Sequence, residues 1–225
     1  MKKRILSILL LCCMVLTMLP TTVLAADGPM DTIPKYDVSI DVYNRTSDIS
    51  IKDSRSYYIY SSVPDKLRDT WAWDKKIFIK GDKTAPHVFI DGVNIEMSPS
   101  SKGPAIELNK KASAYIYFIG KNSSLQGADG RAAIQKNRSE GQLYVLARTG
   151  TTVTCKGGDK AAGIGGSYAT RNISNGYYNG DMYGHGVNMH FGSQSNPDYW
   201  GGTIAAIGGN GGAGIGGGQG GSGEK

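Results

Sequence analysis

Aromatic and amide side chains gather in one stretch of the chain, from about residue 167 to residue 200. An aromatic ring packs well on the apolar face of a sugar, and neighbouring amide groups bond the sugar hydroxyls. Loops on a rigid scaffold are also where binding usually resides. The stretch therefore predicts a polysaccharide-binding insertion with sugar-stacking residues Tyr168, Tyr177, Tyr178, Tyr183, Tyr199 and Trp200. The alternative is a loop whose rings pack on the scaffold or against a neighbouring molecule.

A second aromatic candidate is the pair Trp71 and Trp73. Residues two apart lie on one face of an extended strand, so the two indole rings would form a single platform for a sugar. Capping of the first coil of a repeat structure is the favoured interpretation, because the open end of such a structure exposes its core.

Charged residues that could cleave a polysaccharide are present but form no pattern. A lyase needs a base and a cation, and a glycosidase needs two facing carboxylates. The candidates, none of which stands out from a solvated surface, are Asp91, Glu96, Glu107, Lys110 and Lys111. We therefore predict no catalytic residue.

Metal ligands are equally sparse. Asp181, His185 and His190 lie close in sequence, and the scattered acidic residues could supply oxygen ligands for calcium, but their spacing shows no ligand cluster. The expectation is no metal and no cofactor.

A repeated pentapeptide indicates how these residues are carried. Ala-Gly-Ile-Gly-Gly occurs at 162–166 and 213–217, with looser copies around Ile106 and Ile134. The isoleucines at 106, 134, 164 and 215 are separated by 28, 30 and 51 residues, the last interval being one period plus the insertion. A fixed period of this size is typical of stacked units. We expect equivalent isoleucines to form an inward ladder, with Val153 opposite Ile204 and Cys155 opposite Ala206.

Short segments rich in β-branched and aromatic residues recur between Gly, Asn, Asp and Ser from about Tyr36 to Leu146, and no stretch shows a sustained helical period. After residue 140 the chain holds 25 of its 32 glycines, which suit tight corners. The pattern predicts an all-β chain that folds as a right-handed parallel β-helix. A β-sandwich with glycine-rich loops is the alternative.

The domain organisation follows from the same patterns. Lys2, Lys3 and Arg4 precede an apolar run that ends in Val23-Leu24-Ala25, which predicts a signal peptide over 1–25. Residues 26–75 are expected to form an N-terminal β cap region, and residues 76–225 the β-helix repeats. We therefore predict a secreted protein, extracellular or associated with the cell surface, with no membrane segment once the leader is cleaved.

Charge and cysteine content narrow the partners. Removal of the leader lowers the formal net charge from +6 to +3, and the remaining basic residues are interspersed with acidic ones. Nucleic acid is therefore not an expected partner, since it selects clustered Lys and Arg. The mature chain keeps Cys155 alone of its three cysteines, so no intramolecular disulfide can form. A buried thiol is the favoured interpretation.

The Ala-Gly-Ile-Gly-Gly blocks, Ile90 to Ile95 and Ile207 to Gly212 resemble the glycine-rich repeats of secreted surface proteins from anaerobic Gram-positive bacteria. The resemblance extends from about Lys76 to the end. It implies a β-helical carbohydrate-binding domain, similar in fold to polysaccharide lyases, although other such proteins have no known activity. Because neither a polar closing coil nor a wall-anchoring signal is recognisable, we expect the chain to be the N-terminal part of a longer protein.

Three classes of function follow. The first is a surface binding or adhesion module that recognises polysaccharide or cell-wall glycan through the aromatic insertion. The second is a structural stalk or spacer within a larger surface protein. The third, and least expected, is a polysaccharide lyase or glycosidase.

Overall fold

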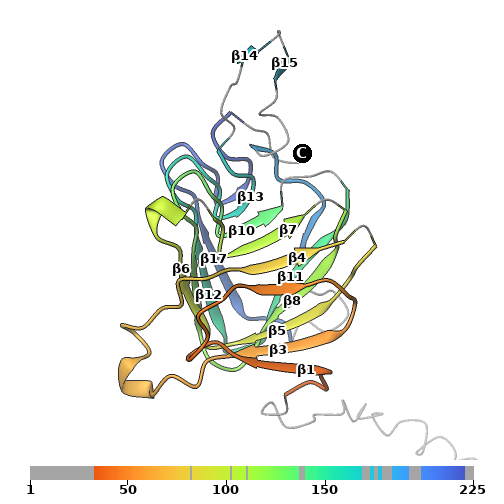
Figure 1. The fold of residues 1–225 in the computed structure, drawn as a ribbon, viewed down its shortest axis with the longest axis vertical. Coiled ribbons are helices and arrows are strands. Elements are labelled where there is room, and N and C mark those ends of the chain that lie inside the picture. The colour runs from red at the N-terminus through yellow and green to blue at the C-terminus, as the bar shows by residue number, and fades with distance from the viewer. Residues whose placement is uncertain are drawn as a thin grey trace, which may run out of the picture. The chain divides into compact units, whose positions relative to one another are not determined.

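The computed structural model describes residues 33–220, except for 82, 102, 110, 137–139, 169–172, 175–176, 179–183 and 193–198. The described strands belong to one compact unit, Pro34–Lys225, and stack one above another (Figure 1).

Three parallel sheets form the walls of the unit, and every pairing within them is parallel. Sheet A contains β1 (Val38–Asp41), β3 (Ser56–Tyr60), β5 (His87–Asp91), β8 (Ala114–Phe118), β11 (Leu143–Ala147) and β16 (Met189–Phe191). Sheet B contains β2 (Ile49–Ile51), β4 (Ile77–Lys80), β7 (Ile106–Asn109), β10 (Ile134–Lys136), β13 (Ile164–Gly165) and β18 (Ile215–Gly216). Sheet C contains β6 (Asn94–Glu96), β9 (Ser123–Gln126), β12 (Thr152–Lys156) and β17 (Thr203–Ile207).

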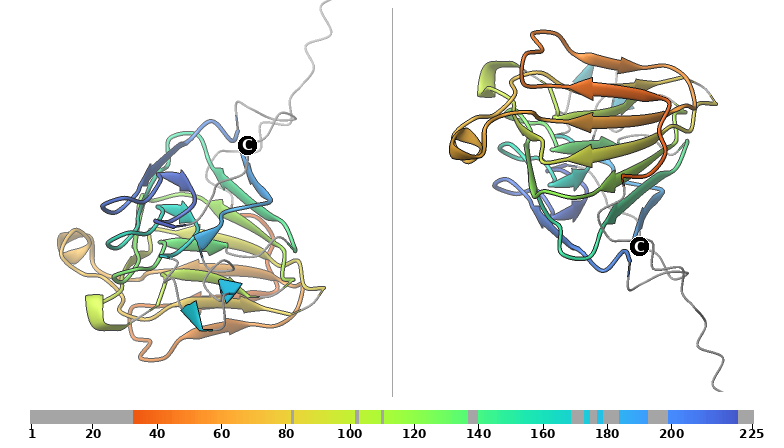
Figure 2. Two further views of the ribbon diagram at one scale, coloured as in Figure 1. Left: turned by 90° about the horizontal axis from the view of Figure 1, so that it is seen from above. Right: turned by 90° about the horizontal axis from the view of Figure 1, so that it is seen from below.

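From β5 onward the strands follow a repeating order along the chain. Each turn contributes one strand to sheet A, then one to sheet C, then one to sheet B. Four turns are complete in this sense, beginning at β5, β8, β11 and β16. The sheets surround the core when the molecule is viewed from above or below (Figure 2). This arrangement confirms the predicted parallel β-helix and excludes the β-sandwich alternative.

The predicted isoleucine ladder is present and longer than expected. Ile106, Ile134, Ile164 and Ile215 are in register on sheet B, and Ile77 and Ile49 extend the column toward the N-terminus. All but Ile215 are buried, and burial of one such side chain contributes about 1.5–3 kcal/mol. The predicted pairs Val153 with Ile204 and Cys155 with Ala206 are also confirmed. Cys155 is fully buried, and burial raises the pKa of its thiol to about 12.

Glycine in the pentapeptide allows neighbouring turns to approach closely. A Cβ added at Gly163 would lie 2.7 Å from the backbone nitrogen of Ile207 and 2.8 Å from the carbonyl oxygen of Gly214, both in the following turn. A side chain there would force the turns apart, so this glycine determines how tightly the turns stack.

The segment 26–75, predicted to form a cap region, contributes β1, β2 and β3 to the same sheets as the later repeats. It also contains the short 3₁₀ helix η1 (Asp65–Leu67); a second one, η2 (Pro99–Ser101), follows β6. Within the predicted insertion at 167–200, β14 (Ile173–Ser174) and β15 (Tyr177–Tyr178) form an antiparallel hairpin. The strand β16 lies in the same interval but belongs to sheet A. Among the described residues, no helix has the length and apolarity needed to cross a bilayer.

Candidate functional site

A cleft of about 700 Å³ lies over the outer face of sheet C, beside the loop that carries η1. A smaller recess of about 140 Å³ adjoins it and shares Asp69, Asn94 and Ser124 with it. We call the two together the sheet C groove. The loop that forms one wall projects from the stacked turns near sheet C (lower left in Figure 1). The residues around the groove are Asp65, Arg68–Ala72, Asn94–Glu96, Gly120–Ser124, Gln126, Thr152 and Thr154.

The floor of the groove is a regular array of small polar side chains. The outward positions of successive sheet C strands are in register, so Asn94, Ser124 and Thr154 form one column. Glu96, Gln126 and Lys156 form the next column. Within a column, the side chains repeat at the strand spacing of about 4.8 Å. No hydrogen bond within the described part of the chain engages the hydroxyls of Ser124 or Thr154. These hydroxyls are available to a ligand.

The wall of the groove is held by Arg68, although its loop has little regular structure. The guanidinium of Arg68 donates to the carbonyl oxygens of Gly92 at 3.1 Å and Val63 at 3.3 Å. The side-chain amide of Asn94, on the floor, donates to the carbonyl oxygen of Arg68 at 2.9 Å. The loop is thus tied to both the corner and the strand beneath it. A wall fixed in this way avoids part of the ordering cost of binding.

The charges around the groove are unevenly paired. Asp65 contacts the amine of Lys121 at 2.9 Å and the guanidinium of Arg68 at 3.3 Å. The hydrogen bond from Lys121, with a further contribution from Arg68, lowers the pKa of Asp65 below its usual value. Asp69 and Glu96 also border the groove, and neither forms an ion pair or a side-chain hydrogen bond with the other described residues.

Of the two predicted tryptophans, the structure places only Trp71 beside the groove, where it lines the smaller recess. Its ring is half-buried and packs edge-on against Tyr43, with the ring centroids 5.4 Å apart. Trp73 is 3 % exposed, and its indole nitrogen donates to the carbonyl oxygen of Arg45 at 2.8 Å. The two rings therefore do not form a shared platform: one borders the groove, and the other belongs to the core.

The outer face of sheet A holds an aromatic array that we did not predict from the sequence. His87, Tyr115, Tyr144 and His190 occupy one register column. Their rings stack nearly parallel, with centroid separations of 4.7, 4.5 and 4.5 Å along the column. Phe89 and Tyr117 stack in the next column at 4.9 Å. We call this array the aromatic face. The separations of 28 and 29 residues between His87, Tyr115 and Tyr144 match the repeat period, and this signal would have revealed the column.

Of the predicted sugar-stacking residues, Trp200 lies against the aromatic face, and Tyr199 packs on Trp200. The rings of Trp200 and Tyr117 are 5.1 Å apart, and Tyr199 meets Trp200 edge-on at 4.6 Å. The guanidinium of Arg148 donates to the hydroxyl of Tyr199 at 2.6 Å and also lies 5.1 Å from the centre of its ring. Both residues therefore pack on the scaffold, as in the alternative interpretation of the insertion.

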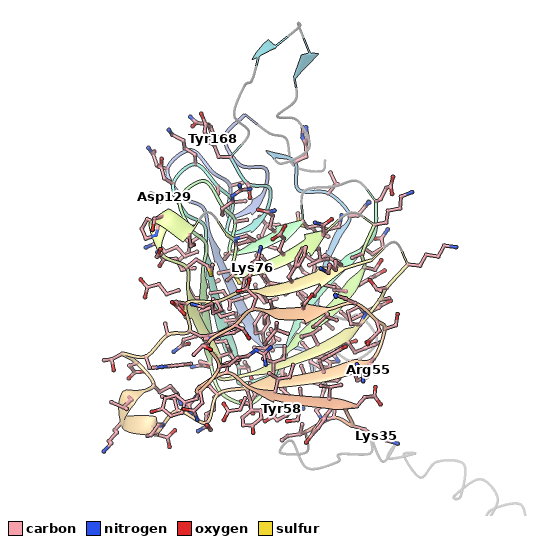
Figure 3. The ribbon with its side chains drawn as sticks, in the orientation of Figure 1. Lys35, Arg55, Tyr58, Lys76, Asp129 and Tyr168 are labelled. Atoms are coloured by element: carbon pink, nitrogen blue, oxygen red, sulfur yellow. The ribbon has the colours of Figure 1, made fainter. Side chains whose placement is uncertain are left out.

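The remaining predicted residues are not brought together. Tyr168 lies at the opposite end of the stacked turns from Tyr58 (Figure 3), with the Lys160 amine 5.1 Å from the centre of its ring. The side chains of Tyr177 and Tyr178, and all of Tyr183, lie outside the described residues.

The acidic residues considered for catalysis are on different walls. Asp91 ends β5 in sheet A and accepts a hydrogen bond from the Tyr58 hydroxyl at 2.8 Å. Glu107 lies in sheet B and pairs with Lys76 at 2.6 Å, and Lys111 pairs with Glu140 at 2.9 Å. Of the candidates, Glu96 borders the sheet C groove, and Lys110 is outside the described residues. Two facing carboxylates are therefore not assembled from this set.

Within the part of the chain that the structure describes, no group of three or more His, Cys, Asp or Glu side chains is placed to hold a metal ion. Asp181, one of the three residues considered for metal binding, lies outside that part. Comparison of the chain with family models, curated proteins and solved structures gives no match. The chemistry of the groove must therefore be inferred from the residues that line it.

Proposed function

We propose that this protein is a secreted polysaccharide-binding module, and that a glycan chain binds in the sheet C groove. The observation that carries the proposal is the regular column of Asn94, Ser124 and Thr154 beneath a preformed wall. A polymer of repeating units is matched by binding groups that themselves repeat, and the neighbouring strands β9 and β12 each supply a free hydroxyl at the same position, from Ser124 and Thr154. These hydroxyls both donate and accept hydrogen bonds, as sugar hydroxyls require. The Asn94 amide instead holds the wall, because it donates to the carbonyl oxygen of Arg68 and accepts from the backbone N–H of Ser124.

The groove also offers a half-buried aromatic ring, Trp71, at the recess. Aromatic rings contact the apolar faces of sugars, while polar groups around them fix the orientation of the ligand. The insertion remains part of the proposal as a second contact surface through Tyr168, Tyr177, Tyr178 and Tyr183. The groove is the primary site, because Trp200 is engaged with the aromatic face and Tyr199 with Trp200.

A glycan array probed with the mature chain tests this function, followed by measurement of affinity for the best glycan. The diagnostic variant is Ser124→Tyr, which fills the groove from an exposed strand position. Tyrosine is tolerated well in strands, so the fold should persist. We expect the dissociation constant to rise at least about tenfold, equivalent to about 1.4 kcal/mol.

The matched control is Ser50→Tyr, the same change at an exposed position of β2 in sheet B. This variant should bind like the wild type. If Ser124→Tyr binds normally while the combined change of Tyr177 and Tyr178 to Ala abolishes binding, the site is the insertion and not the groove.

The stacked aromatic face favours a second candidate, a structural spacer. Successive turns are joined on that face by rings about 4.5–4.7 Å apart, which suits a stiff element that sets reach. Absence of binding to any glycan or cell-wall fraction would favour the spacer over the binding module.

A further inference from the structure

The charged side chains that border the sheet C groove come from three elements. The loop contributes Asp65, Arg68 and Asp69, the corner between sheets A and C contributes Lys121, and β6 contributes Glu96. Lys156, which follows Glu96 and Gln126 in the same column, lies outside the lining. These groups determine which kinds of glycan the groove can accept.

Both cations of the lining are already committed. The Lys121 amine lies 2.9 Å from a carboxylate oxygen of Asp65, and that same oxygen receives Arg68 at 3.3 Å. The Arg68 guanidinium also bonds two backbone carbonyl oxygens, and its side chain is only 17 % exposed. The Lys121 side chain is 55 % exposed and keeps donors beyond the one that Asp65 uses, but its charge is already balanced by that carboxylate. With three carboxylates against two cations, the lining carries a net negative charge.

The carboxylates of Asp69 and Glu96 are in the opposite situation. Both residues are exposed, and neither is paired with a cation in the described chain. An ionised carboxylate only accepts hydrogen bonds, so a sugar hydroxyl is a suitable partner and a second carboxylate is not. A polymer of acidic sugars would bring a charge of the same sign to each unit along these residues.

We infer that the sheet C groove selects an uncharged glycan, whose hydroxyls donate to Asp69 and Glu96. This inference rests on the proposed function, because it specifies the class of ligand for the same site. Acidic sugar polymers are disfavoured by two unpaired carboxylates and by the excess of carboxylates over cations in the lining.

The test compares a neutral gluco-hexasaccharide with a hexagalacturonate of equal length, titrated calorimetrically into the mature protein at low salt and at 0.5 M salt. We expect the neutral oligomer to bind at least about tenfold more tightly at low salt. Its affinity should change little with salt, since screening acts on charged pairs. In the double variant Asp69→Asn/Glu96→Gln, the acidic oligomer should gain affinity, so that the two oligomers bind with more nearly equal dissociation constants.

A matched control separates this effect from a change in net charge. Asp129→Asn removes one exposed carboxylate outside the groove lining and should leave the preference unchanged, whereas Asp69→Asn should reduce it. If hexagalacturonate binds more tightly than the neutral oligomer and Ser124→Tyr blocks that binding, the inference is overturned while the proposed function stands. If neither oligomer nor any other glycan binds, the proposed function itself fails, and the inference fails with it.

Discussion

The outer faces of sheets A and C are built on the same coils but differ in what they leave open to solvent. On sheet A, the rings of Tyr115 and Tyr144 each have a neighbouring ring on both sides. On sheet C, the equivalent outward positions hold Ser124 and Thr154, whose hydroxyls have no partner in the described chain. Aromatic rings in register therefore bind one another, whereas short polar side chains in register remain available. The number of aromatic residues on a face does not by itself identify a sugar site.

The largest expected effect comes from the core beneath both faces. Ile134→Ala removes a fully buried member of the ladder between Ile106 and Ile164. Truncation of a buried isoleucine to alanine costs about 2–5 kcal/mol. Chemical denaturation should show a loss of this size, and heating should end glycan binding and the far-ultraviolet strand signal together. Loss of one without the other would mean that the two faces do not share a cooperative core.

Removal of a ring from the aromatic face should separate stability from binding. Tyr115→Ala deletes the two close pairs of its column, with His87 and with Tyr144, and also the wider pair with Tyr117, whose ring centroid is 6.5 Å away. A close pair contributes about 0.5–1.5 kcal/mol beyond area burial, so we expect the two close pairs alone to account for a loss of about 1–3 kcal/mol in the free energy of unfolding. Glycan affinity, measured well below the melting temperature, should be unchanged.

Thr154→Ala is the counterpart of this variant on sheet C. Its free energy of unfolding should change by less than about 0.5 kcal/mol, as is usual for surface substitutions, while glycan affinity falls. A Tyr115→Ala variant that binds glycan poorly, beside a Thr154→Ala variant that binds normally, would reverse the assignment of the two faces.

The difference between the faces also explains what could be predicted from the sequence. Ile164 and Ile215 lie in identical pentapeptides, so the repeat itself marks their register and the ladder could be predicted. Tyr115 and Tyr144 are separated by one period, yet they lie in strands whose sequences otherwise differ. The repeat alone therefore did not predict their aromatic column. The groove could not be predicted from the sequence. Its wall depends on contacts such as the hydrogen bond from Arg68 to Gly92, and these contacts follow no periodic pattern.

A smaller effect is expected from loosening the wall of the groove. Arg68→Ala removes the guanidinium bonds to Gly92 and Val63. We expect a loss of about 1 kcal/mol in the free energy of unfolding, because part of the bonding is replaced by water. Glycan affinity should fall about tenfold, since the loop must then be ordered on binding.

Arg55→Ala is the matched control for this change. It removes an exposed arginine that pairs with Asp53 at 2.9 Å, away from the groove. This variant should keep full affinity. Equal losses of affinity in the two variants would indicate a general effect of charge rather than a specific role of the wall.

The smallest effect is acid sensitivity, and it too should differ between the faces. Arg55, and then Tyr57, hold the pKa of Asp53 near sheet A down to about 2, and Lys121 lowers the pKa of Asp65 at the groove. A carboxyl group whose pKa is lowered by folding stabilises the native state above its unfolded pKa of about 3.9, and this contribution is lost as the pH falls through the folded value. For Asp53 the loss should therefore occur between about pH 4 and pH 2. Asp53→Asn should remove that part of the acid dependence of stability without changing glycan binding.

Asp65→Asn should weaken glycan binding at pH 7, because the neutral amide no longer forms the ion pair with Lys121 that ties the loop to the corner of the groove. If the two substitutions affect binding equally, the ion pair at the groove has no role that the pair near sheet A lacks.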